Sequence, residues 1–171
     1  MAKTKRTTQI VVCDAGPLIH LDEVGCLDLL ADFSQVLVPE AVWMEVERHR
    51  PTALTSPDAR LSRVVPATAE TAEFQAIARL FALDAGELQA LQLVTQVEVD
   101  LLLTDDTAAR LAASHLGISV HGTIGILVRS IRRGQRRSQQ VADLLRSLPT
   151  ISTLHLSQSL LDEVLQAVER T

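Results

Sequence analysis

The chain has 171 residues, of which 47% are hydrophobic and 22% charged, and this balance excludes a disordered chain. Its formal net charge of -5 at pH 7 argues against indiscriminate nucleic-acid binding, and an aromatic content of 2% without tyrosine argues against a base-stacking surface. We predict a single domain over residues 9–171, with a basic tail at 1–8 and the helices of 138–171 packed on the domain.

The first half of the chain alternates short apolar runs with segments of helical periodicity. In chain order, we predict a strand at 10–13, two short helices within 17–33 separated by Gly25, a strand at 35–39, a helix at 40–49 and a helix at 69–81. The connection at 50–68 contains prolines and mixed polarity, so we expect it to be irregular. Within it we predict a short helix near Asp58 and a strand at 63–65.

The second half continues this alternation. We predict a helix at 83–97 with Asp84 as its N-cap, a strand at 100–104, a helix at 105–117 with Gly117 as its C-cap, a strand at 118–122, a helix at 123–134, a helix at 138–148 ended by Pro149, and a terminal helix capped by Ser157 or Ser159. Strands that alternate with helices predict an α/β fold, in which a parallel sheet is covered by helices on both faces.

The cellular compartment is predicted from hydropathy and from the cysteines. No segment approaches the length of a membrane span, and the apolar run behind the basic start is too short for a signal-peptide core. Cys13 and Cys26 cannot build a disulfide framework, and their settings are typical of small buried hydrophobic residues. We therefore expect a cytoplasmic protein that does not enter a membrane.

Acidic residues follow several of the predicted strands, where functional groups gather in an open parallel sheet. Asp14 directly follows the first strand, and Asp105 and Asp106 directly follow "LLLT". Glu45 lies one turn into the helix after the second strand, and Glu87 lies in the first turn of the helix that opens with "LDAGE". These side chains can therefore converge at one end of the sheet.

Each acid also has a purely structural interpretation. Asp14 is a suitable turn residue, and Asp105 is a suitable N-cap. Asp84 and Glu87 have the spacing of a capping box. Glu45 is flanked by other charges in "EVER" and fits a solvated helix face. Taken one at a time, these structural interpretations are favoured.

The acids taken together favour a cation site. Carboxylates a few Å apart repel one another by several kcal/mol at intermediate dielectric, and a divalent cation would offset this. An all-oxygen ligand set suits Mg²⁺ or Mn²⁺, and no spacing of cysteine and histidine offers a zinc site. The histidines are scattered, and a lone histidine such as His20 is more often a core or surface residue than a ligand.

The densest positive charge lies in "RSIRRGQRRSQQ". Its arginines are Arg129, Arg132, Arg133, Arg136 and Arg137. Arginine binds phosphate oxygens bidentately, so this stretch is a candidate for holding a nucleic-acid backbone. The alternative is a solvated helix end, where cations complement the helix dipole. The sequence leaves both interpretations open.

Five stretches, in this order, resemble the PIN-like nucleases, most closely a prokaryotic branch of unknown function related to toxin ribonucleases. They are "VVCDAGPLIHL", "VLVPEAVWMEV", "LDAGELQALQL", "DLLLTDDTAARLAASHLGISVHGTIGILVRSIRRG" and "LLDEVL". No single stretch is specific, but the ordered set covers nearly the whole chain. The resemblance implies a Rossmann-like three-layer α/β/α fold and a metal-dependent endoribonuclease that uses Mg²⁺ or Mn²⁺ to hydrolyse RNA.

The resemblance also implies roles for individual residues. The four family acids map onto Asp14, Glu45, Glu87 and Asp105, with Asp106 as a neighbouring helper. Asp14 and Asp105 would be direct metal ligands, joined by Asp106, whereas Glu45 and Glu87 would hold metal-bound waters or orient the nucleophile. We expect hydrolysis to follow the general chemistry of metal-activated water.

This chain departs from the family pattern beside the first acid. Many members have a hydroxyl residue there, whereas this chain has Ala15 and Gly16. The carboxylates are therefore expected to hold the metal without hydroxyl help. His121 stands where an aliphatic residue is expected, and the sequence offers no physical reason for it.

The sequence also allows functions other than nuclease activity. A catalytically weak PIN-like module that binds RNA or protein is the main alternative, although all four acids are present. The resemblance also allows a toxin subunit paired with an antitoxin protein, and the apolar residues Trp43 and Met44 favour a homodimer. A haloacid-dehalogenase or receiver fold is excluded, because Gly16 replaces a required acid and no lysine follows Lys5.

Overall fold

The computed structural model describes residues 9–68 and 70–170, so the predicted basic tail at 1–8 lies outside the described residues. The strands are β1 (Ile10–Cys13), β2 (Gln35–Pro39), β3 (Leu61–Val64), β4 (Leu101–Leu103) and β5 (Val120–His121). They form one parallel sheet in the order β3-β2-β1-β4-β5. The strand order changes direction between β1 and β4, which is where ligands bind in open α/β sheets.

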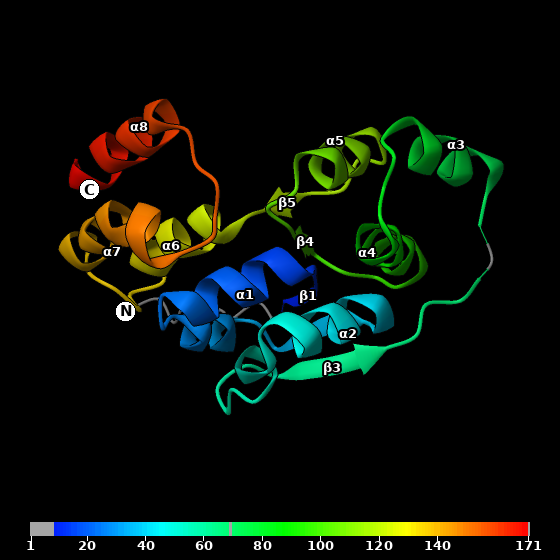
Figure 1. The fold of residues 1–171 in the computed structure, drawn as a ribbon, viewed down its shortest axis with the longest axis horizontal. Coiled ribbons are helices and arrows are strands. Elements are labelled where there is room, and N and C mark those ends of the chain that lie inside the picture. Colours follow the sequence, from blue (N-terminus) through cyan, green and yellow to red (C-terminus); the bar gives the residue numbers. More distant parts are fainter. Residues whose placement is uncertain (1–8, 69, 171) are drawn as a thin grey trace, which may run out of the picture.

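Helices lie on both faces of this sheet (Figure 1). They are α1 (Ala15–Glu23), α2 (Glu40–His49), α3 (Ala72–Leu80), α4 (Ala85–Gln96), α5 (Thr107–His115), α6 (Thr123–Arg132), α7 (Ser138–Ile151) and α8 (Gln158–Glu169). Two short 3-10 helices, η1 (Leu27–Asp32) and η2 (Pro51–Leu54), complete the connections.

Alternating side chains along the strands separate the core into two parts. On β1, Val11 joins the hydrophobic cluster that includes Leu18 of α1 and Leu127 of α6. Val12 points to the opposite face and joins the cluster that includes Leu91 of α4. The predicted three-layer α/β/α arrangement is therefore confirmed, with α1, α2 and α6–α8 on one face and α3–α5 on the other.

The helix predicted to end at Pro149 is longer than expected. α7 continues to Ile151, and the backbone N–H of Ser152 donates to the carbonyl of Leu148 at 3.0 Å. A proline in the last turn removes a single helical hydrogen bond. Burial of Leu145 and Leu148 stabilises the helix around this turn, so the prediction of a stop at Pro149 was wrong.

The connection at 50–68 also differs from the prediction. It has no helix near Asp58; its short helix is η2, which begins at Pro51, where a missing backbone N–H costs nothing. The strand predicted at 63–65 begins two residues earlier, as β3. The second short helix after Gly25 is η1, a 3-10 helix instead of an α-helix.

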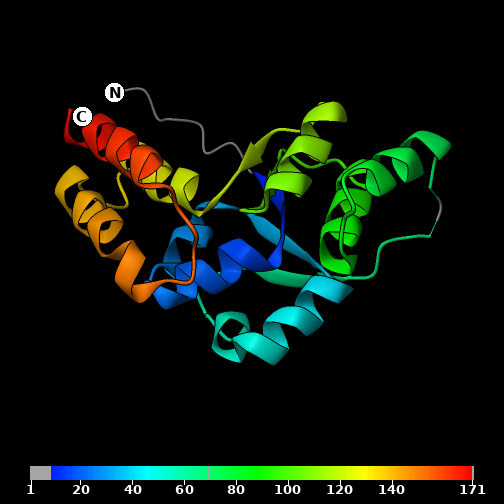
Figure 2. The ribbon, with the colours of Figure 1, turned by 45° about the horizontal axis from the view of Figure 1, so that its top comes forward.

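An extended segment at residues 152–156, which we call the C-terminal strap, connects α7 with α8 (Figure 2). Glu23, the last residue of α1, holds the start of this strap. Its carboxylate accepts hydrogen bonds from the hydroxyl of Ser152 at 2.7 Å, and from the backbone N–H and the hydroxyl of Thr153 at 2.8 Å each. The strap is therefore fixed across the end of α1.

Two features used to predict the compartment are visible in the structure. Cys13 and Cys26 are buried free thiols, as expected for small hydrophobic residues. No helix in the described ranges is long and apolar enough to cross a membrane. The cytoplasmic location stays a prediction.

Candidate functional site

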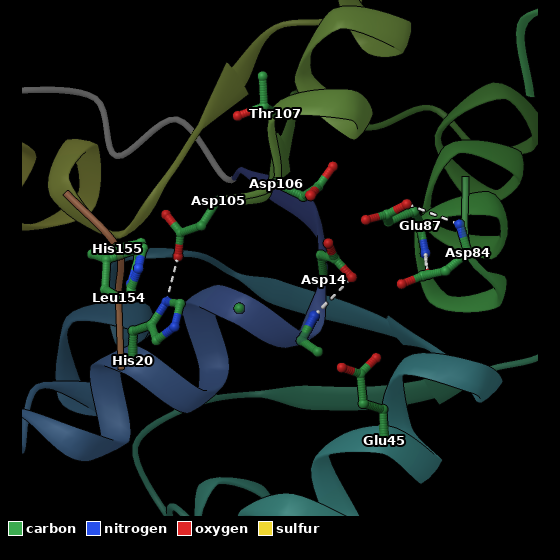
Figure 3. Close-up of a pocket in the computed structure, with 12 residues that line it drawn as sticks. Asp14, His20, Glu45, Asp84, Glu87, Asp105, Asp106, Thr107, Leu154 and His155 are labelled. Atoms are coloured by element: carbon green, nitrogen blue, oxygen red, sulfur yellow. Dashed lines mark hydrogen bonds and ion pairs between the residues drawn. The ribbon is translucent and has the colours of Figure 1, made fainter. Parts of the chain in front are cut away.

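The acidic residues predicted from the sequence line one cavity of about 360 Å³ at the carboxyl ends of the strands. Its acidic lining consists of Asp14, Glu45, Asp84, Glu87, Asp105 and Asp106. They come from the end of β1, from α2, from the start of α4 and from the connection between β4 and α5 (Figure 3). The fold thus brings together all four predicted catalytic acids and the helper Asp106.

Asp14 is both a helix cap and a wall of the cavity. Its backbone N–H donates to the carbonyl of Leu103 at 2.9 Å, which continues the pairing of β1 with β4. One carboxylate oxygen, Oδ1, accepts from the backbone N–H of Ala15 at 2.8 Å and so caps α1. The structural and functional interpretations of this residue are therefore compatible.

Burial makes the charge on Asp14 costly. The residue is 6% exposed, and this desolvation raises the pKa of its carboxyl to about 6. The hydrogen bonds from Ala15 and Thr104 oppose this rise, and the carboxylates of Glu45 and Asp84 add to it. Asp14 therefore lies in an electronegative environment that favours either a proton or a bound cation.

A hydroxyl does support the first acid, but it comes from a different strand. The hydroxyl of Thr104 donates to Oδ2 of Asp14 at 2.8 Å, and Thr104 is fully buried. Asp14 thus has a hydroxyl partner in Thr104, whereas the expectation that the carboxylates hold the metal without hydroxyl help stays a prediction. The sequence signal was the threonine of "LLLTDD", which immediately precedes Asp105 and Asp106.

Asp84 and Glu87 form the predicted capping box at the start of α4. The backbone N–H of Glu87 donates to Asp84, and the backbone N–H of Asp84 donates to Oε2 of Glu87, both at 2.9 Å. Burial raises the pKa of Glu87 to about 7; the Asp84 backbone bond opposes the rise, and the carboxyls of Asp84 and Asp106 strengthen it. The box fixes Glu87 at the cavity.

Glu45 approaches the same cavity from α2. Burial raises the pKa of its carboxyl, and the nearby charge of Asp84 raises it further. Its Oε2 lies against the start of α4, 3.2 Å from the point that a Cβ on Gly86 would occupy. The absence of a side chain at Gly86 therefore makes room for Glu45, which does not occupy the freely solvated position considered from the sequence.

The adjacent residues Asp105 and Asp106 have different surroundings. Asp106, and not the predicted Asp105, is the N-cap of α5 and accepts from the backbone N–H of Ala109 at 2.8 Å. Asp105 accepts from Nδ1 of His20 at 2.8 Å, from the backbone N–H of Thr123 at 2.7 Å and from its hydroxyl at 2.6 Å. In Figure 3, Asp105 points toward His20 and Asp106 toward Glu87.

This arrangement gives roles to residues that the sequence did not identify. His20 is neither a core residue nor a free surface residue, because it orients Asp105. The backbone N–H of Thr123, which could have received a phosphate at the start of α6, is occupied by the same carboxylate. His20 is 85 residues from Asp105 in the sequence and Thr123 is 18 residues from it, so no local sequence pattern predicts these contacts.

Gly122 offers a test of how tightly Asp105 is held. An added Cβ would lie 2.5 Å from Oδ1 of Asp105 and 3.2 Å from the carbonyl of Thr104. We expect Gly122→Ala to lower the free energy of unfolding by about 2 kcal/mol, the usual cost of overpacking. Gly86→Ala is the control, because its added Cβ would meet an oxygen of the movable Glu45 side chain. Denaturant unfolding should show a larger loss of stability for Gly122→Ala than for Gly86→Ala. Equal losses of stability would contradict tight packing around Asp105.

Three of the five arginines proposed to bind nucleic acid are paired within the protein. Arg129 and Arg133 form ion pairs with Asp32, at 2.7 Å and 2.8 Å. Arg136 pairs with Asp28 at 2.8 Å. These contacts fasten α6 and the turn after it to η1, which gives the three arginines a structural function.

The remaining two, Arg132 and Arg137, are exposed. Thr123 at the start of α6 contacts the acidic cavity, whereas Arg132 is the last residue of that helix. Nine residues of helix span about 13 Å, so this end of α6 is remote from the acids. The predicted nucleic-acid role of the arginines stays a prediction.

The cavity suits a hard cation by its donor chemistry. Figure 3 shows the carboxyl groups of Asp14, Glu45, Glu87 and Asp106 facing a common space, and no arginine or lysine lines it among the described residues. Oxygen ligands of this kind suit Mg²⁺ or Mn²⁺. In the described ranges, however, no three acidic, histidine or cysteine groups lie close enough to form a finished metal site.

Comparisons with known proteins agree with this architecture. A family model described as a PIN domain matches residues 10–170, which include every acid of the cavity. No curated protein and no solved structure matches the chain.

Proposed function

The chain belongs to the PIN-domain family, whose members are generally nucleases, and from this premise we propose that it is an endoribonuclease that depends on Mg²⁺ or Mn²⁺. The observation that carries the proposal is the convergence of Asp14, Glu45, Glu87 and Asp106 on one cavity without a balancing cation among its described residues. Burial raises the pKa of Asp14 and of Glu87, and the neighbouring carboxylates raise both pKa values further. A divalent cation would stabilise the ionised form of both.

Each acid then has a distinct role. Asp14 and Asp106 would hold the ion, each with one carboxylate oxygen on a backbone N–H that fixes its orientation. Asp105, oriented by His20 and Thr123, would complete the ligand set from the other side. A bound Mg²⁺ or Mn²⁺ would lower the pKa of a coordinated water and neutralise charge developing on the phosphate.

Glu87 is the strongest candidate for a general base. The pKa of its carboxyl is about 7 without a metal and would fall when a cation binds nearby, so Glu87 would be ionised and able to accept a proton near neutral pH. Its backbone and Oε2 are held by the capping box, which leaves Oε1 outside the box to take the proton from the attacking water. Glu45, with its pKa also raised by burial, would orient that water from the side of α2.

Matched glutamates on one helix test the proposal. Glu45 lines the cavity, whereas Glu47, two residues later on α2, is exposed outside it. We expect Glu45→Gln to lower the rate of RNA cleavage by about tenfold, and Glu47→Gln to leave it unchanged. The measurement is cleavage of mixed RNA substrates with Mg²⁺, Mn²⁺ or chelator; cleavage that persists in chelator would rule out the metal-dependent mechanism.

The proposed partners extend this function. RNA is the substrate, and a small antitoxin protein that covers the acidic cavity is a partner if the chain is a toxin component. The proposed homodimer has less exposed apolar surface to form it than the sequence suggested. Trp43 packs against the core with the guanidinium of Arg63 over its ring, which leaves Met44, 48% exposed, as the apolar residue of that pair at the surface.

A further inference from the structure

A second cavity, of about 370 Å³, adjoins the acidic one on the side of the C-terminal strap. Asp105, Thr107, Leu154 and His155 line both cavities, so the two adjoin along these residues. The close-up in Figure 3 shows Leu154 and His155 of the strap beside His20 and Asp105. A ligand that crosses Asp105 can therefore occupy both spaces.

The second cavity has far fewer acidic groups than the first. Its one acid among the described residues is Asp105, which is already bound by His20 and Thr123. Arg110 of α5 is exposed and lines this cavity. The Nη1 nitrogen of its guanidinium donates to the carbonyl of Thr104 at 3.2 Å, and no described carboxylate forms an ion pair with Arg110. Arg110 is therefore anchored and still has N–H groups to offer to an anion.

The field at His121, another lining residue, has the same sign. The pKa of this imidazole is lowered first by burial and then by the positive charges of Arg129, Arg132 and Arg110. Of these three arginines, Arg129 is paired with Asp32, and Arg110 is the one that lines the cavity itself. An anionic ligand would be attracted to this cavity, whereas the carboxylates of the acidic cavity would repel it in the absence of a cation.

The remaining wall is aliphatic. Ile124 of α6, Leu156 of the strap and Leu160 of α8 line the cavity, and Leu160 is 44% exposed. Glu23 secures the start of the strap, so this wall is held by the same contacts that fix the strap to α1. The cavity combines an apolar wall with an anchored arginine, which suits a base or ribose that carries a phosphate.

We propose that this cavity binds one nucleotide of single-stranded RNA next to the scissile phosphate, with the neighbouring phosphate on Arg110. This inference rests on the proposed nuclease function, because the position beside the acidic cavity defines which phosphate is cleaved. Pockets that enclose small ligands have volumes of about 300 Å³ or more, and this cavity lies near the lower end of that range. A base within a duplex cannot leave its stack to enter such a cavity without a cost, so single strands are favoured.

Binding in the presence of chelator tests the site separately from cleavage. The probe is a fluorescent single-stranded RNA of about six nucleotides, measured by anisotropy at several salt concentrations with the full chain. We expect Arg110→Gln to weaken binding about tenfold and to reduce the salt slope by about 0.7, the value for one phosphate contact. Leu160→Glu, at an exposed position that tolerates a polar side chain, is expected to weaken binding as well.

Arg79→Gln is the matched control, because Arg79 is an exposed arginine on α3 outside both cavities. Unchanged affinity and salt slope in Arg110→Gln would overturn the nucleotide site, as would tighter binding of duplex RNA or no binding by the wild type. Cleavage with Mn²⁺ separates the two proposals. If the wild type cleaves RNA and Arg110→Gln binds RNA normally, only the proposed nucleotide site is contradicted. If the wild type does not cleave RNA and Arg110→Gln binds RNA weakly, only the proposed nuclease function is contradicted.

Discussion

Replacing Asp14 with asparagine is expected to lower RNA cleavage by about 100-fold or more, because this change removes a ligand charge from the centre of the acidic cavity. Asparagine keeps the size of the side chain and an oxygen that can accept from the backbone N–H of Ala15. The cap of α1 should therefore survive. The measurement is the initial rate of cleavage with saturating Mn²⁺.

The control for this substitution is Asp58→Asn, at an exposed acid outside the cavity. It should leave the cleavage rate unchanged. Full metal-dependent activity of a pure Asp14→Asn preparation would contradict the assignment of Asp14 as a ligand. Loss of activity together with loss of the cooperative unfolding transition would instead show that the hydrogen bond from Thr104 to Asp14 is needed for folding.

The second large effect is on stability as a function of pH. The pKa of Asp14 is raised from 3.8 to about 6, so the folded state holds this proton more tightly than the unfolded state does. The resulting stability is fully present below about pH 4 and is lost as the pH rises through 6. A shift of about two pKa units corresponds to a loss of about 3 kcal/mol. Glu87, whose pKa is about 7, extends the loss toward pH 7.

Denaturant unfolding of wild type and Asp14→Asn in chelator, between pH 4 and pH 8, measures this effect. Relative to the variant, wild type should lose stability across that interval, since the variant has no carboxyl at position 14 to ionise. Mg²⁺ or Mn²⁺ should restore stability to wild type at pH 8, because a ligand of the native state stabilises it. Parallel stability curves for the two proteins, together with no stabilisation by either metal, would contradict a charged cation site.

These two predictions are linked by one physical cause. A carboxylate buried among other carboxylates destabilises the metal-free fold near neutral pH and attracts a divalent cation. The same side chain would therefore limit stability and support catalysis. Asp14→Asn should be the more stable protein at pH 8 without metal and the less active one with metal.

Much of the fold was predictable because it depends on local patterns. The apolar run of β1 followed by Asp14, and the similar run of β4 followed by Asp105, identify buried parallel strands that end in polar groups. Their alternation with helices determines a sheet with two covered faces. The capping box of Asp84 and Glu87 was also predictable, since its partners are three residues apart.

Tertiary structure decided which side chains meet. The contact of Thr104 with Asp14 crosses 90 residues, and that of His20 with Asp105 crosses 85, so neither leaves a periodic signal. The pairing of β1 with β4 creates the first, and the packing of α1 beside the β4–α5 connection creates the second.

The same reason explains the arginines. The sequence located the positive charge of "RSIRRGQRRSQQ", but only the fold pairs Arg129 and Arg133 with Asp32 and places Arg110 in the second cavity with Asp105. Charge is a property of composition, whereas its partner depends on how distant segments pack. The sequence by itself thus determined the family of architecture and the identity of the acids; the fold decided which of them are held, and by which groups.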